Sequence, residues 1–184
     1  WALLRKLSSG DTSQADVLFV EGSTFREMRA KLNGQPELLH ITRDMNDADI
    51  MSRLGMAGQS PEGWFFPDTY RFDKRSEDIA VLQRALAAMQ KQLNTVWLSR
   101  DANLPLKSPY ELLILASIVE KETGTAADRA QIAGVFINRL RKGMRLQTDP
   151  TVIYGLGERF DGNLRKADLQ RDTPHNTYTR AGLP

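Results

Sequence analysis

The chain has 184 residues, of which 25 are basic and 23 acidic, and it contains no cysteine and only two histidines. The balanced charge gives no sign of nucleic-acid binding, and the missing cysteines exclude disulfides, thiol catalysis and cysteine metal ligands. His40 and His175 lie far apart in the sequence, so we expect no metal site, and no cofactor motif is visible. No run approaches the roughly 20 consecutive apolar residues that cross a membrane as a helix.

The first 60 residues contain patterns typical of both strands and helices, which indicates a small α+β unit. Thr24 is followed three positions later by Glu27, a capping box that marks the start of an amphipathic helix. That helix is expected to end at the Asn33-Gly34 pair, because glycine is common after a helix C-terminus. The other elements expected here are the end of a helix at residues 1–7, a strand at 16–21 and a short helix near 47–54.

The middle of the chain changes character. Residues 61–72 are rich in aromatic side chains, and their prolines and glycine exclude a helix. This stretch is either a strand or loop that packs at a domain junction or an aromatic platform for sugar rings, and the pattern leaves both open. Ser76 is expected to cap a long amphipathic helix that ends near Ser99, and two further helices are expected at 108–124 and 126–141.

The stretch from Ser108 to Gly124 is the feature around which the chain is organised. Ser108 can cap the helix, Pro109 suits its first position, and Glu111 can return the hydrogen bond to Ser108. The interior is apolar on nearly every side, so we expect a helix that is buried all round and ends in the polar sequence 120–123. A carboxylate at the negative end of a helix dipole, against apolar neighbours, has a raised pKa, which suits a general acid near neutral pH.

Two glutamates at this helix end compete for that role. Glu120 and Glu122 both continue apolar stripes of the helix, so periodicity alone does not choose between them. They lie about 200° apart around a regular helix, so both cannot point into one cleft. The alternative interpretation is that the Glu-Lys-Glu run is an ordinary solvated helix end.

Three long motifs then carry a family resemblance. They are Gly63-Trp-Phe-Phe-Pro-Asp-Thr69, Ala116-Ser-Ile-Val-Glu-Lys-Glu-Thr123 and Leu146-Gln-Thr-Asp-Pro-Thr-Val-Ile-Tyr154, and a shorter one, Thr173-Pro-His-Asn-Thr-Tyr178, follows them. With these motifs the chain resembles the endolytic murein transglycosylases, the MltG or YceG-like family, over nearly its whole length.

The resemblance implies a fold and a location. The fold is a LysM-like strand–helix unit at residues 1–60, truncated at its N-terminus, followed by a mainly helical, lysozyme-like catalytic domain at 61–184, truncated at its C-terminus. One membrane helix is implied outside this chain, anchoring the protein in the cell inner membrane with its catalytic part in the periplasm. Peptidoglycan glycan strands are implied as the substrate and peptidoglycan synthases as partners.

The resemblance also implies a reaction and the residues that carry it. The family cleaves the MurNAc-GlcNAc bond of nascent strands internally and leaves 1,6-anhydroMurNAc ends. Glu122 is the implied catalytic glutamate, acting as general acid and then as base. Gln147, Asn176 and Tyr178 are implied substrate-groove residues, and Tyr154 is expected in the core or the groove wall and is included as a substrate-binding candidate.

Other polar residues have simpler interpretations. Asp149 precedes a proline and is expected to cap the short helix that begins at Pro150. His175 is expected on the groove or the surface, and Arg139 and Arg141 are either solvated helix charges or substrate contacts. The rival function is a non-catalytic peptidoglycan-binding or scaffolding module whose groove is catalytically idle.

Overall fold

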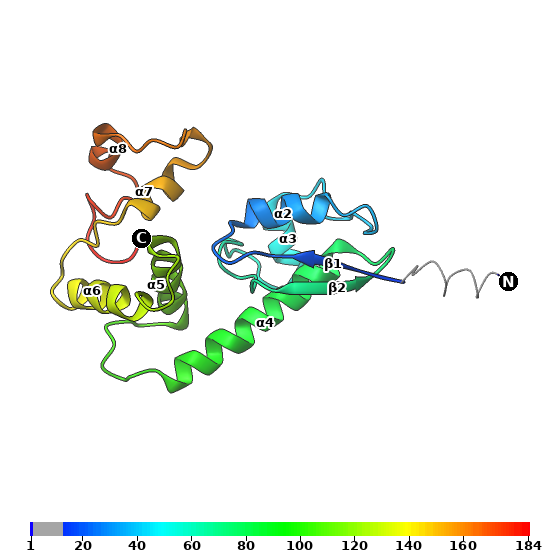
Figure 1. The fold of residues 1–184 in the computed structure, drawn as a ribbon, viewed down its shortest axis with the longest axis horizontal. Coiled ribbons are helices and arrows are strands. Elements are labelled where there is room, and N and C mark those ends of the chain that lie inside the picture. The colour runs from blue at the N-terminus through cyan, green and yellow to red at the C-terminus, as the bar shows by residue number, and fades with distance from the viewer. Residues whose placement is uncertain (2–12) are drawn as a thin grey trace. The chain divides into compact units, whose positions relative to one another are not determined.

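The computed structural model describes residue 1 and residues 13–184, so the helix end expected at residues 1–7 lies outside the described residues beyond Trp1. The chain forms two compact units, residues 1–92 and 93–184, and the division falls within the long helix α4 (Asp78–Ser99) (Figure 1).

The first unit is built on a two-stranded antiparallel sheet. Strand β1 (Gln14–Leu18) pairs with β2 (Thr69–Asp73), with Gln14 opposite Asp73 and Leu18 opposite Thr69. Helices α2 (Phe25–Asn33) and α3 (Asp47–Arg53) lie to one side of the strands (Figure 1). The expected strand at 16–21 is therefore confirmed, although it begins earlier and ends at Leu18.

Local capping chemistry starts two helices of this unit. The Thr24 hydroxyl accepts from the Glu27 N–H, and the Glu27 carboxylate accepts from the Thr24 N–H, so the capping box is confirmed. Helix α4 begins at Asp78, two residues after the expected cap at Ser76. The buried Asp78 carboxylate accepts from the Thr42 hydroxyl at 2.6 Å, so a contact distant in sequence holds this helix start.

The aromatic stretch belongs to the core of the first unit. Phe65 and Phe72 are buried there, and Phe65 stacks on Phe25 with ring centroids 4.9 Å apart. Tyr70 is also buried, and its hydroxyl donates to the Phe66 carbonyl at 2.7 Å. By packing, this stretch is part of the first unit, because β2 pairs with β1. The packing favours a structural role over a sugar platform.

The second unit is helical. It contains α5 (Pro109–Glu122), α6 (Arg129–Arg141), α7 (Asp149–Leu156), the short 3-10 helix η1 (Gly157–Arg159) and α8 (Lys166–Gln170) (Figure 1). Its apolar core gathers residues from α5, α6 and the loops beside them: Leu106, Leu115, Ile118, Val119, Phe136 and Leu146. Within residues 13–184, strand structure is confined to β1 and β2, so the α+β class and the helical second half are confirmed.

Helix α5 departs from two expectations. Its buried residues are Leu115, Ile118 and Val119, whereas Ala116 and Ser117 are exposed, so the helix is buried along one face and not all round. The Ser108 hydroxyl caps the helix as expected, accepting from the Glu111 N–H at 3.2 Å. The Glu111 carboxylate accepts from the N–H of Lys107 and does not return the bond to Ser108, so no closed capping box forms.

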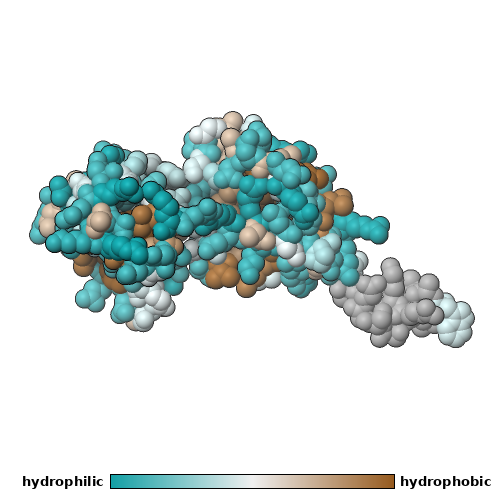
Figure 2. Space-filling view, turned by 90° about the horizontal axis from the view of Figure 1, so that it is seen from above, coloured by the Kyte–Doolittle hydropathy of each residue, from teal (hydrophilic) through white to brown (hydrophobic). Residues whose placement is uncertain are grey.

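The surface shows how these cores are enclosed. Figure 2 shows a mostly hydrophilic face on which apolar side chains gather only in small patches.

The LysM-like and lysozyme-like descriptions and the functional boundary between residues 60 and 61 remain predictions. By packing alone, the compact units meet at residues 92 and 93.

Candidate active site

Glu122 is the last residue of α5, and its exposed side chain reaches a loop distant in sequence. Its Oε2 atom accepts a hydrogen bond of 2.7 Å from the hydroxyl of Thr148. The carboxylate thus lies beside the 147–149 segment, which precedes and begins α7. The helix end and this segment bring an exposed acid, a buried hydroxyl and a peptide turn together.

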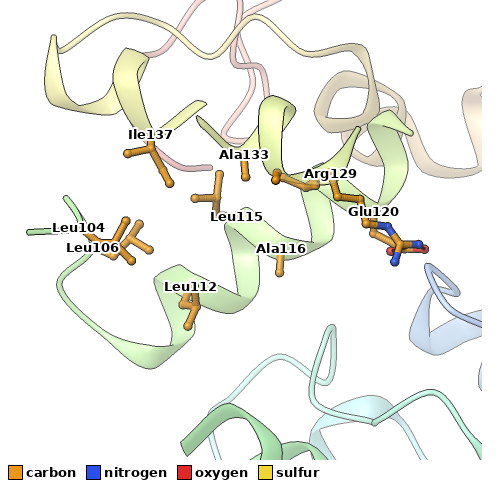
Figure 3. Close-up of a pocket in the computed structure, with 11 residues that line it drawn as sticks. Leu104, Leu106, Leu112, Leu115, Ala116, Glu120, Arg129, Ala133 and Ile137 are labelled. Atoms are coloured by element: carbon orange, nitrogen blue, oxygen red, sulfur yellow. Dashed lines mark hydrogen bonds and ion pairs between the residues drawn. The ribbon is translucent and has the colours of Figure 1, made fainter. Parts of the chain in front are cut away.

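Glu120 points elsewhere. Its Oε2 lies 3.2 Å from Nη2 of Arg129, the first residue of α6, so an ion pair occupies this carboxylate. The pair closes one end of an apolar hollow of about 400 Å³ between α5 and α6 (Figure 3). The two glutamates diverge as the helical period predicts. Among the described residues that line the hollow, only Glu120 and Arg129 have polar side chains, so it lacks the convergent polar groups of a glycan site.

The loop beside Glu122 has an unusual backbone. Gln147 has a φ of 52°, in the left-handed region that costs a non-glycine residue about 1 kcal/mol. Its N–H donates to the Thr177 carbonyl at 3.1 Å, and Arg139 donates to the preceding carbonyl of Leu146. These bonds hold the turn, and they leave the Gln147 side chain exposed next to Glu122's partner Thr148. Backbone strain of this kind is concentrated at functional sites.

Tyr178 is hydrogen-bonded to a second carboxylate of the site, that of Asp149. Its hydroxyl donates to Oδ1 of Asp149 at 2.6 Å. Burial, the bond to Asp149 and the charges of Asp149 and Glu122 together raise the pKa of Tyr178 to about 12. Asp149 is the first residue of α7, and Thr148 occupies the cap position. The expectation that Asp149 caps this helix is therefore wrong, because its carboxylate binds the phenol instead.

The raised pKa makes a prediction about stability in alkali. A tyrosine titrates near 10 when unfolded, and the folded protein favours its neutral form. The stabilisation from Tyr178 should therefore be complete below pH 10 and lost as the pH rises toward 12. We expect the difference in unfolding free energy between wild type and Tyr178→Phe to shrink over that interval, as measured by urea unfolding at several pH values. A difference that stays constant up to pH 11 would contradict this account.

Asn176 lies near Tyr178 in the sequence but inside the fold. Its side-chain nitrogen donates to the carbonyls of Asp168, Leu169 and Arg171 at 3.2, 3.1 and 2.7 Å. Its side-chain oxygen accepts from the Tyr178 N–H at 2.8 Å, and only 1% of the residue is exposed. The amide has no polar atom left for a substrate. The geometry favours a role in positioning Tyr178, and direct substrate contact stays a prediction.

Tyr154 and His175 form a separate pair. Tyr154 is 43% exposed, and its ring meets the His175 ring edge-on with centroids 5.0 Å apart. This pair lies on α7 and the loop after α8. Tyr154 is thus a surface aromatic, available as a wall for a ligand and not part of the core.

The structure brings Glu122, Gln147 and Tyr178 to one region and adds two residues that sequence reasoning missed. Thr148 and Thr177, both 2% exposed, connect the 147–149 segment to the loop of Tyr178. Both threonines belong to the motifs quoted above. Their hydroxyl groups, in the same motifs as the candidate site residues, were the sequence signal that could have indicated them. Of the two arginines, half-buried Arg139 supports the Leu146 carbonyl and exposed Arg141 donates to the Asn103 carbonyl.

Metal-binding clusters and membrane-spanning helices are both absent from the part of the chain that the structure describes, residue 1 and residues 13–184. No group of three or more histidine, cysteine, aspartate or glutamate side chains in this part of the chain is arranged to bind a metal ion. None of its helices combines the length and the apolar character that crossing a membrane demands.

Comparison with known proteins establishes the family. The model of the YceG-like family matches residues 1–184, and the chain belongs to that family. It is 34% identical over 204 residues to the endolytic murein transglycosylase of Bacillus subtilis, covering 99% of this chain and 55% of that protein. It is 37% identical over 128 residues to the endolytic murein transglycosylase of Streptococcus pneumoniae, covering 66% of this chain and 22% of that protein.

A solved structure shares the fold. The crystal structure of a yceG-like protein from Listeria monocytogenes matches with a TM-score of 0.73 at 30% sequence identity. The match covers 100% of this chain and 66% of that one. The chain thus spans about half the length of the Bacillus relative and a smaller part of the Streptococcus relative.

Proposed function

We propose that the protein containing this chain is a lytic transglycosylase that cleaves peptidoglycan glycan strands internally. The single observation that carries the proposal is the environment of Glu122. Its carboxylate accepts a hydrogen bond from the Thr148 hydroxyl and lies near Tyr178. The names of the Bacillus and Streptococcus relatives support the same substrate and reaction.

The proposed reaction needs one carboxyl group. Protonated Glu122 gives its proton to the glycosidic oxygen, and the bond from that oxygen to C1 of N-acetylmuramic acid breaks. The C6 hydroxyl of the same sugar then bonds to C1, and its proton passes to the Glu122 carboxylate, which restores the acid. The products are a free N-acetylglucosamine end and a 1,6-anhydroMurNAc end, and no water is consumed.

The neighbours of Glu122 suit this sequence of steps. Gln147, the residue before Thr148, has an exposed neutral amide, and Tyr178 presents a phenol that stays protonated at neutral pH. The Gln147 amide can donate to the N-acetyl group of the sugar, and the Tyr178 oxygen, whose proton goes to Asp149, can accept from a sugar hydroxyl. Tyr154 supplies an exposed aromatic ring for the groove wall.

Asp149 raises the question of hydrolysis, because retaining and inverting glycosidases use two carboxyl groups. Its Oδ1 already accepts from the Tyr178 hydroxyl at 2.6 Å. In our proposal Asp149 orients that phenol and takes no part in bond breaking.

Anchoring in the inner membrane, a periplasmic catalytic part and cooperation with peptidoglycan synthases belong to the same proposal.

The test is the chemistry of the new chain ends. The full-length protein is incubated with purified glycan strands, and the fragments are analysed by mass spectrometry. Anhydro ends, lighter by one water than reducing ends, are the expected result. Reducing ends would indicate a hydrolase, and glycan binding without cleavage would indicate the non-catalytic module.

A further inference from the structure

Thr148 makes one side-chain hydrogen bond, and that bond goes to Glu122. The residue is 2% exposed, and its hydroxyl donates to Oε2 of Glu122 at 2.7 Å. A hydroxyl has one proton to give. Within the described part of the chain, Oε1 of Glu122 takes part in no hydrogen bond, so the two oxygens of this carboxyl group have different surroundings.

A closed ring of hydrogen bonds holds Thr148 in place. Its N–H donates to the Thr177 hydroxyl at 3.1 Å, and its carbonyl accepts from the Thr151 hydroxyl at 2.8 Å. The hydroxyls of Thr151 and Thr177 lie 2.9 Å apart. The Thr177 hydroxyl also lies 3.4 Å from the Thr148 carbonyl, so either hydroxyl can donate to the other while the remaining one donates to that carbonyl. In either arrangement each of the two hydroxyls gives its one proton within the ring, inside a site that excludes water.

The backbone before Thr148 is fixed as well. The left-handed turn at Gln147 is tied through its N–H to the Thr177 carbonyl, and the Leu146 carbonyl accepts from Arg139. Thr148 is therefore held on both sides by bonds that do not involve Glu122. The loop is rigid independently of the acid, and it can orient the acid.

We propose that Thr148 is the positioning residue for Glu122, an inference that rests on the proposed transglycosylase function. The hydroxyl of Thr148 directs the reactive proton to Oε1. When Glu122 is a carboxylate, Oε2 accepts from Thr148 and Oε1 is left to take the proton of the sugar hydroxyl. When Glu122 is protonated on Oε1, Oε2 still accepts from Thr148. The same bond thus persists through both halves of the reaction, and the acid does not turn between them.

A matched pair of substitutions isolates the hydroxyl. Thr148→Val keeps the branched shape and removes the bond to Glu122, whereas Thr148→Ser keeps the hydroxyl and removes a methyl group. Misplacing a catalytic group by about 1 Å can cost roughly 100-fold in rate. We expect Thr148→Val to lower kcat about 10- to 100-fold with KM nearly unchanged, and Thr148→Ser to restore most of the rate.

The experiment uses the full-length protein, purified glycan strands and the release of anhydro ends, with thermal melting of each variant. Thr148→Val is also combined with Glu122→Gln, where it should have no further effect because the acid is already missing.

Equal activity of wild type and Glu122→Gln would defeat the proposed function itself. Loss of activity in Glu122→Gln with a fully active Thr148→Val would overturn only the role of Thr148. Equal impairment of the valine and serine variants, with lowered melting temperatures, would also overturn it, since packing would then be the cause.

Discussion

Glu122→Gln in the full-length protein is expected to lower the release of anhydro ends by about 100- to 10,000-fold. Glutamine keeps the volume of the side chain, and its amide oxygen can still accept from the Thr148 hydroxyl. It cannot, however, carry a proton to the glycosidic oxygen or take one from the sugar. We expect the upper end of the range, because Asp149, a second carboxylate of the site, already accepts a hydrogen bond from Tyr178.

Glu120→Gln is the matched control, because it makes the same chemical change two residues away on the same helix. It removes the ion pair with Arg129. The side chains of Glu120 and Arg129 are 30% and 46% exposed, so losing the pair should lower the unfolding free energy by only about 0.5 kcal/mol. Activity should stay close to that of wild type. Thermal melting shows whether either variant is misfolded. A loss of activity in Glu120→Gln alone would transfer the catalytic role to Glu120 and its apolar hollow.

The sequence predicts what is decided locally. The Ser108 and Thr24 caps, the ends of α2 and the divergence of the two glutamates all depend on residues a few positions apart. The pairing of β1 with β2 joins Gln14 to Asp73, and no local pattern specifies it. For this reason the sequence pattern places the aromatic stretch after the first unit, whereas in the structure it supplies most of the second strand of that unit's sheet.

The candidate site shows the same division. The motif around Glu122 marks an acid, but its partner Thr148 lies 26 positions later, and Tyr178 lies 29 positions after Asp149. Asp149 before a proline has the pattern of a helix cap, and tertiary contact with Tyr178 overrides that pattern. Likewise, an asparagine in a polar motif gives no information about whether its amide faces a ligand or the backbone.

Asn176→Asp is expected to lower the unfolding free energy of the second unit by about 3 to 5 kcal/mol at neutral pH. The substitution is nearly isosteric, but it places a carboxylate oxygen where the amide nitrogen meets three carbonyl oxygens, at 2.7 to 3.2 Å. The position is only 1% exposed, so water cannot relieve the repulsion. Because these bonds tie the end of α8 to the loop of Tyr178, the site should lose its shape together with the fold.

The pH dependence of that variant gives the sharper test. A buried aspartate surrounded by acceptors has a folded pKa above its unfolded value, so its protonated form is favoured in the fold. The loss of stability should be smallest in acid, below the unfolded pKa, and should grow as the pH rises. Asn163→Asp, the same change at an exposed position, should shift stability by less than about 0.5 kcal/mol. Urea unfolding at several pH values measures both. If Asn176→Asp instead unfolds like wild type and loses only glycan binding, its amide contacts the substrate, as the family resemblance implies.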